Sequence, residues 1–128
     1  MKIVTLIARI LLGVTFLFFG LNGFLNFIPQ QPMPDGLAKQ FLVALVASHY
    51  VIFVSGIQIV SGILFVINRY VPLALTLIGP VIVNILLFHA FMAPSMILPG
   101  ILVTLFWFIV FWRVRSAFAG IFQQKVEG

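Results

Sequence analysis

The sequence predicts an all-α integral membrane protein, a bundle of four spanning helices with both termini in the cytoplasm. Two observations carry this prediction. Hydrophobic residues make up 63% of the chain and charged residues only 7%, whereas a soluble domain keeps about a quarter of its residues charged. At about 20 residues per helical span, four spans nearly fill 128 residues. We therefore expect one transmembrane domain and no separate soluble domain.

The first span is predicted at about residues 4–27. Its apolar run is longer than the core of a secretory signal, and no small-residue cleavage site follows it, so we expect the helix to be retained. Gly13, Gly20 and Gly23 fall on one helical face, and Arg9 lies on the same face. Because glycines let a neighbouring helix approach closely, this face is predicted to be buried.

The second span is predicted at about residues 45–67, after an external proline-rich loop at residues 28–37. Three prolines and an Asp-Gly pair prevent a helix from continuing through this loop. The apolar stretch that begins at Leu37 is too long for one upright span. We therefore expect a short amphipathic helix first, and then a break or tilt near residues 48–50.

The third and fourth spans are predicted at about residues 70–91 and 97–113. Pro72 suits the first turn of the third helix. Pro80 lies in the middle of that helix, where it removes a backbone hydrogen bond, so we expect a kink and a freed carbonyl at Thr76.

The basic residues predict the orientation. By the positive-inside rule, the side of the membrane that holds more Lys and Arg is cytoplasmic. Their position at the span ends also makes anionic lipid headgroups, and not nucleic acid, the expected partners for a net charge of +5. One side holds Lys2, Arg9, Arg69, Arg113, Arg115 and Lys125, and the other holds Lys39.

Several classes of chemistry are excluded by the residues that the chain lacks. It has no cysteine, so thiol–disulfide exchange and thiolate metal sites are excluded. Its two acidic residues, Asp35 and Glu127, fall in the predicted loop and tail, which excludes transport coupled to a membrane-embedded carboxylate. The sequence contains no hydrolase triad, metal-ligand cluster or phosphate loop. We predict no catalytic residue and no metal site.

Arg9 and Gln58 form a candidate polar pair between helices. Arg9 lies about 8 Å and Gln58 about 15 Å from the cytoplasmic ends of their predicted helices. An extended arginine side chain could span that difference. In the alternative interpretation, Arg9 reaches back to the membrane interface and Gln58 bonds a neighbouring backbone.

A second group of polar and aromatic residues is predicted near the outer leaflet. These side chains could line a small pocket for a quinone-like head group or a lipid, or they could serve only to join helices. Two histidines at similar depth are also compatible with haem ligation, which we disfavour because histidines are common at membrane interfaces. The candidate pocket residues are Asn22, Asn26, His49, Asn84, Phe88 and His89.

Several short motifs stand in a fixed order over nearly the whole chain. They are Arg9–Gly13, Gly20–Phe24, Pro32–Pro34, Gly62, Arg69–Leu75, Pro80–Asn84 and Phe88–His89. This ordered series resembles the DoxX family of small four-span bacterial membrane proteins, and the resemblance implies the same fold. It also implies a redox association, since the family is named for a subunit of an archaeal quinone-linked thiosulfate- or quinol-oxidising system.

Two positions depart from that family pattern. Members often carry a glutamate where Gln58 stands and a lysine where Gly23 stands. The expected function is therefore an accessory or scaffold subunit in the bacterial inner membrane, without catalytic activity of its own, that holds a lipid or quinone. Membrane redox enzyme subunits, or further copies of the chain, are its expected partners. One alternative is an electron-transfer component of a quinone-linked oxidoreductase, and another is a small-solute carrier gated at Pro80.

Overall fold

The computed structural model describes residues 2–28 and 35–125, and within these ranges all regular secondary structure is helical. Four helices are long and apolar enough to cross a membrane, namely α1, α3, α4 and α5 with its short extension η2. The described elements are, in order, α1 (Lys2–Leu25), α2 (Leu37–Ala47), α3 (Tyr50–Ile67), α4 (Val71–Phe91), η1 (Pro94–Met96), α5 (Leu98–Val114) and η2 (Arg115–Phe118).

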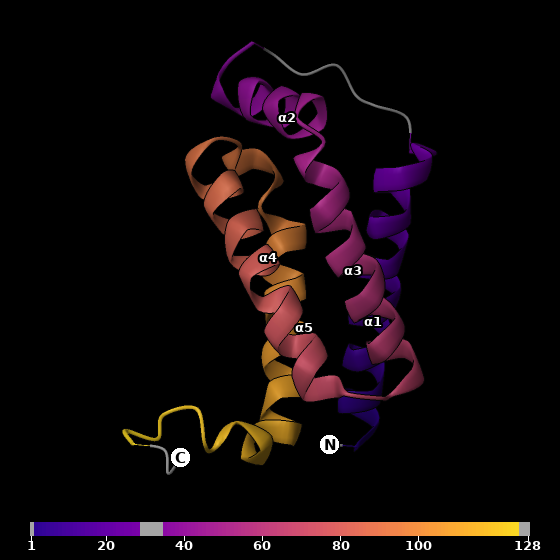
Figure 1. The fold of residues 1–128 in the computed structure, drawn as a ribbon, viewed down its shortest axis with the longest axis vertical. Coiled ribbons are helices and arrows are strands. Elements are labelled where there is room, and N and C mark those ends of the chain that lie inside the picture. The colour runs from indigo at the N-terminus through magenta and orange to yellow at the C-terminus, as the bar shows by residue number, and fades with distance from the viewer. Residues whose placement is uncertain (1, 29–34, 126–128) are drawn as a thin grey trace.

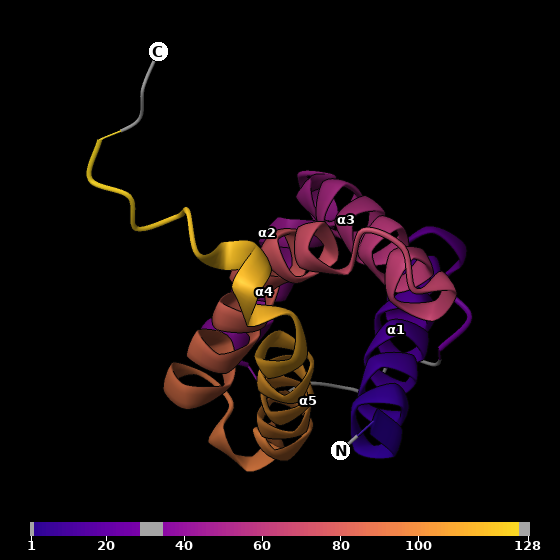
Figure 2. The same ribbon diagram turned by 90° about the horizontal axis from the view of Figure 1, so that it is seen from below.

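The four long helices lie side by side, and α2 lies across one end of them (Figure 1). Helix α1 packs mainly on α3 and also on α5, while α4 packs on both α3 and α5. Figure 2, seen from the opposite end to α2, shows the resulting order α1, α3, α4, α5 around the assembly. The start of α1 and the end of α5 therefore lie together at the end away from α2.

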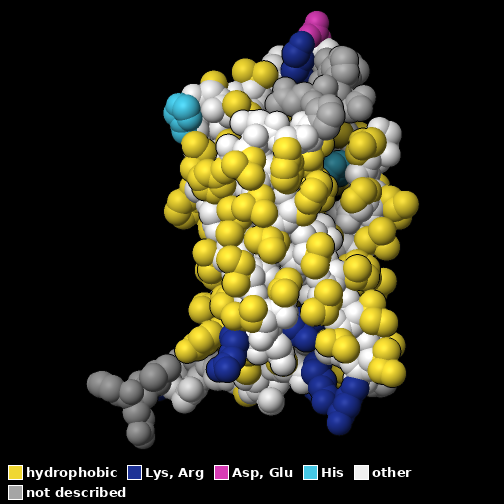
Figure 3. All heavy atoms as spheres, turned by 90° about the vertical axis from the view of Figure 1, so that its right-hand side faces the viewer, with side chains coloured by type: hydrophobic (Ala, Val, Ile, Leu, Met, Phe, Trp, Pro, Cys, Tyr) yellow, Lys and Arg dark blue, Asp and Glu magenta, His cyan; other side chains and the backbone are white. Residues whose placement is uncertain are grey.

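Positive charge is concentrated at that end, which we call the basic end. Figure 3 shows Lys and Arg side chains gathered there, and a separate basic side chain beside an acidic one at the other end. Lys39 and Asp35 form that separate pair, with an Nζ–Oδ1 distance of 3.1 Å. The basic end carries Lys2, Arg9, Arg69, Arg113 and Arg115.

The face shown in Figure 3 is mostly apolar between the two ends. Many large side chains on the four long helices are exposed, such as Phe19 on α1 and Phe53 on α3. The buried core is narrow by comparison, with Leu12, Phe65 and Leu75 fully inaccessible. An apolar exterior around a small core is the arrangement expected when hydrocarbon surrounds the helices.

Helices α1 and α3 are antiparallel and meet along the predicted glycine face. A Cβ atom added at Gly13 would lie 2.9 Å from the carbonyl oxygen of Gly62, and one at Gly20 would lie 2.9 Å from that of Ser55. These separations are too short for a real side chain, so the two backbones are in direct contact. The glycine face predicted from the sequence is confirmed as buried.

The predicted break before the third described helix is also confirmed. Helix α2 ends at Ala47, and His49 has a left-handed backbone with φ 64°. Helix α3 begins only at Tyr50, so the predicted start at residue 45 falls in α2. Most of the predicted proline-rich loop, residues 29–34, lies outside the described residues.

Candidate functional site

The polar residues predicted to line an outer pocket hydrogen-bond within their own segments. Asn22 Oδ1 accepts a bond of 2.8 Å from the backbone N–H of Ile28, just beyond the end of α1. Asn84 Nδ2 donates to the carbonyl of Pro80 at 2.9 Å, one turn earlier in α4. In the same helix, His89 Nδ1 lies 2.8 Å from the carbonyl oxygen of Ile85. None of these three bonds joins two of the long helices.

Asn26 and His49 serve a different purpose, since both adopt a left-handed backbone at φ 52° and φ 64°. Asn26 follows the end of α1 and His49 lies between α2 and α3, and both are exposed. Asparagine tolerates this conformation better than most residues, which explains its place at a helix end. These two residues shape turns.

Phe88 is the candidate residue that reaches another helix. Its ring lies 5.4 Å from that of Phe41 on α2 and 5.1 Å from that of His89. This contact helps to hold α2 across the end of α4. The described contacts of these candidate residues are therefore local, apart from the contact of Phe88 with α2.

Asn84 differs most from what its position in the sequence suggests. We expected it to face other helices, yet its side chain is exposed, and α1 packs on α3 and α5 rather than on α4. Its amide bonds the carbonyl of Pro80, not the carbonyl of Thr76 that the proline leaves without its usual donor. A bond to its own helix satisfies the donor without any neighbour, so Asn84 does not join α1 to α4.

Arg9 crosses from α1 to α3 and bonds the backbone there. Its Nη1 donates to the carbonyls of Phe65 and Val66, the second at 3.3 Å. These carbonyls belong to the last turn of α3, where the helix dipole is negative and carbonyls lack partners within the helix. A guanidinium at this point is favourable both as a hydrogen-bond donor and as a charge.

Arg9 forms these backbone bonds and not the candidate pair with Gln58. The reason is the antiparallel register, in which Gly13 meets Gly62 and Gly20 meets Ser55. A residue later in α1 is therefore level with a residue earlier in α3 by the same number of positions. Arg9 is level with the end of α3, whereas Gln58 stands beside the Leu17–Gly20 turn, about 10 Å away along the helix.

Trp107 provides an interhelical bond that the sequence reasoning missed. Its Nε1 on α5 donates to the carbonyl of Leu75 on α4 at 3.0 Å. The indole packs beside Gly79, where an added Cβ would make an ordinary van der Waals contact of 3.9 Å with the ring. A tryptophan in the middle of an apolar span carries one N–H that needs an acceptor, and this is the signal that could have revealed the bond.

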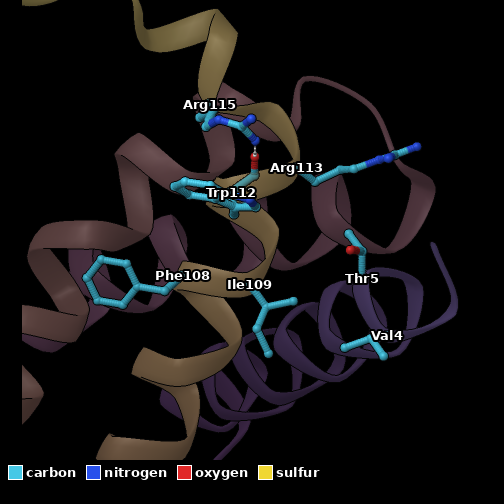
Figure 4. Close-up of a pocket in the computed structure, with 7 residues that line it drawn as sticks. All are labelled: Val4, Thr5, Phe108, Ile109, Trp112, Arg113 and Arg115. Atoms are coloured by element: carbon cyan, nitrogen blue, oxygen red, sulfur yellow. Dashed lines mark hydrogen bonds between the residues drawn. The ribbon is translucent and has the colours of Figure 1, made fainter. Parts of the chain in front are cut away.

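Two adjoining cavities lie between α1 and α5 at the basic end, and they share Thr5 and Arg113. The larger has a volume of about 480 Å³. Figure 4 shows Ile109 extending from α5 towards Val4 of α1, and Arg113 extending to the side on which Thr5 stands. The residues that line the larger cavity are Val4, Thr5, Phe108, Ile109, Trp112, Arg113 and Arg115.

The smaller cavity, of about 190 Å³, lies where the basic ends of all four long helices meet. Lys2 and Arg9 approach it from α1, Arg113 from α5, and Asn68 from the end of α3. Its wall is completed by Leu6, Val71, Val110 and Val114, with Thr5 and Arg113 common to both cavities. We call the two cavities together the α1–α5 cleft.

The cleft is electropositive because its cations have no acidic neighbour among the described residues. The one described carboxylate, Asp35, is paired with Lys39 at the other end of the assembly. Arg115 is held in place by its Nη1 bond to the Trp112 carbonyl and by its position 4.1 Å above the Trp112 ring. Such a set of donors suits an anion, and Thr5 and Asn68 add neutral hydrogen-bonding groups beside it.

Among the cations that line the cleft, Lys2, Arg113 and Arg115 were assigned only to orientation by the sequence reasoning, and Arg9 was also assigned to the candidate pair with Gln58. The signal that could have found the site is the presence of Lys2, Arg113 and Arg115 at the same end of the first and last spans. Comparison with family models, curated proteins and solved structures found no match for this chain.

Proposed function

We propose that this chain is an accessory or scaffold protein of the bacterial inner membrane, a four-helix bundle of the DoxX type with both termini in the cytoplasm. The observation that carries the proposal is the use of its interior polar groups. Arg9 ties α1 to α3, and Trp107 ties α5 to α4. Groups that are committed to the backbone of a neighbouring helix hold the assembly together and are not free for chemistry.

The surface supports the same proposal. Four long helices present exposed apolar side chains over most of their length, as lipid or a membrane partner would require. The basic end carries the excess of Lys and Arg that the positive-inside rule assigns to the cytoplasm. In this role the protein offers a lipid-facing surface to partner subunits of a membrane complex, including redox enzymes.

Two experiments test the proposal. Reporter fusions at Asn68 and at Gly128 should be active only in the cytoplasm, and a fusion at Gln31 only outside; a C-terminal reporter active outside would refute the orientation. For the role itself, affinity capture in mild detergent followed by mass spectrometry should identify a membrane partner. Purified protein that alone transports solutes into liposomes, or alone passes electrons to a quinone, would refute an accessory role.

A further inference from the structure

The geometry points to a specific site for an anionic phospholipid in the α1–α5 cleft. This inference rests on the proposed embedding of the helices in a membrane, and it assigns a ligand that the scaffold role does not require. Its phosphate would lie among the cations at the basic end, and an acyl chain would run along α5. Two independent features support it, one for each part of the lipid.

The headgroup part is defined by charge and donor geometry. Lys2 from α1 and Arg113 from α5 reach the smaller cavity, and Asn68 adds a neutral side chain from the end of α3. Arg9 adds positive charge at the same cavity, while its Nη1 stays bonded to α3. Arg113 also lines the larger cavity, and it has no hydrogen bond or ion pair among the described residues. A phosphate is complementary to these donors, because it carries negative charge and several acceptor oxygens.

The acyl part is defined by an apolar path that leaves the cleft. The larger cavity is bordered on α5 by Trp112, Ile109 and Phe108, in order from the basic end. Trp112 and Phe108 are exposed by 60% and 57%, and Leu105 and Ile101 continue the same stripe at 53% and 48%. Their spacing of four, three and four residues keeps them on one helical face. The stripe therefore leads from the cations towards the middle of the membrane.

The joining of these two features favours a lipid over a free phosphate. A soluble anion would use the cations and leave the apolar half of the cleft without a partner. A phospholipid satisfies both, because its phosphate lies at the membrane surface and its chains lie beneath it. The Trp112 ring, with Arg115 above one face, stands at the boundary between the two regions, where tryptophan is favoured.

Native mass spectrometry of the purified protein in detergent tests the site. The protein is mixed with equal amounts of phosphatidylglycerol and phosphatidylcholine that carry the same acyl chains, and the ratio of the two bound lipids is measured. We expect the wild type to prefer phosphatidylglycerol. Arg113→Gln should reduce this preference about fivefold, the effect of one basic side chain near a charged membrane surface.

Arg69→Gln is the matched control. Arg69 lies at the same end and is also exposed, but it borders neither cavity of the cleft. The bound-lipid ratio of this variant should stay within about twofold of the wild type, since its charge acts only through the general surface field. Equal losses in both variants would overturn the site in favour of non-specific attraction, as would a wild type without a preference.

The source of the phosphate is tested with headgroup compounds alone. An excess of inorganic phosphate or of glycerol 3-phosphate should leave phosphatidylglycerol bound, because neither compound fills the apolar half of the cleft. Displacement by either compound at equal concentration would overturn the lipid assignment and leave a site for soluble anions. Since purified protein is used throughout, a failure to capture a partner subunit does not affect this result.

Discussion

Helix α1 contacts its two neighbours in different ways. Along α3, Gly13 and Gly20 bring the two backbones into direct contact. On the α5 side, the first turns of α1 are separated from the end of α5 that carries Trp112 and Arg113. The space between them forms the two cavities of the cleft. One side of α1 is thus closed by small residues, whereas the other is open and lined by cations.

The side of α1 that faces α3 thus has a structural role, and the side that faces α5 carries the candidate functional site. Where helices must associate in lipid, close backbone contact supplies the attraction that the hydrophobic effect cannot. Where the helices stand apart, the residues that line the open space determine what it can bind. Arg9 belongs to both regions, because it bonds the end of α3 and also borders the smaller cavity.

The largest effect is expected from adding a methyl group to the closed side. Gly62→Ala places a Cβ 2.7 Å from the backbone nitrogen of Leu17 and 2.8 Å from the carbonyl oxygen of Gly13, and neither backbone atom can move cheaply. We expect a loss of about 1–3 kcal/mol of stability, the usual cost of overpacking. Thermal unfolding in detergent measures it.

Gly56→Ala is the control on the same helix. An added Cβ at Gly56 meets nothing within 4 Å, so the substitution should be neutral or stabilising by up to about 1 kcal/mol through helix propensity. If Gly62→Ala and Gly56→Ala melted at the same temperature, the direct backbone contact between α1 and α3 would be refuted.

A smaller loss is expected when the tie between α1 and α3 is removed. Arg9→Leu deletes a charged donor to two carbonyls at the end of α3, and we expect about 1.5 kcal/mol of destabilisation. Arg69→Leu removes the same charge at an exposed position whose side chain has no described hydrogen bond, and it should change stability by less than about 0.5 kcal/mol. Equal effects in urea or thermal titrations would show that Arg9 does not hold α3.

The smallest effect is expected at Asn84, on the side of the molecule away from α1. Because its amide is exposed and bonds its own helix, Asn84→Leu should change stability by no more than about 0.6 kcal/mol. Small molecules that co-purify with the protein should also be the same in both forms by mass spectrometry. Loss of a bound lipid or quinone from the folded variant would restore Asn84 to a binding role.

The sequence was a good guide to the helices and a poor guide to their lateral arrangement. Residue spacing revealed the glycine face, and the length of the apolar stretch that begins at Leu37 revealed the break near His49. The pairing of Arg9 could not be predicted, because it depends on the register between two helices that are far apart in the chain. A shift of two turns in that register decides between Gln58 and the carbonyls of Phe65 and Val66.

The candidate site was missed for a related reason. Lys2 and Arg113 lie near opposite ends of the sequence, and only the packing of α1 on α5 brings them to one cavity. Polar residues in the spans attracted attention instead, because hydrocarbon penalises an unpaired polar group. The side chains of Asn84 and His89 meet that requirement with a carbonyl one turn away, which no pattern of residue types distinguishes from a bond between helices.

The contrast between the two sides of α1 is tested most directly by thiol labelling in lipid nanodiscs. The chain has no cysteine, so Thr5→Cys reports on the open side and Ser61→Cys on the fully buried interior of α3. In phosphatidylcholine, a charged maleimide should label the thiol at position 5 and spare the one at position 61. Adding phosphatidylglycerol should slow labelling at position 5 several-fold. Equal protection of both thiols would contradict an open, lipid-binding cleft beside α1. A labelling rate at position 5 that does not change when phosphatidylglycerol is added would contradict it as well.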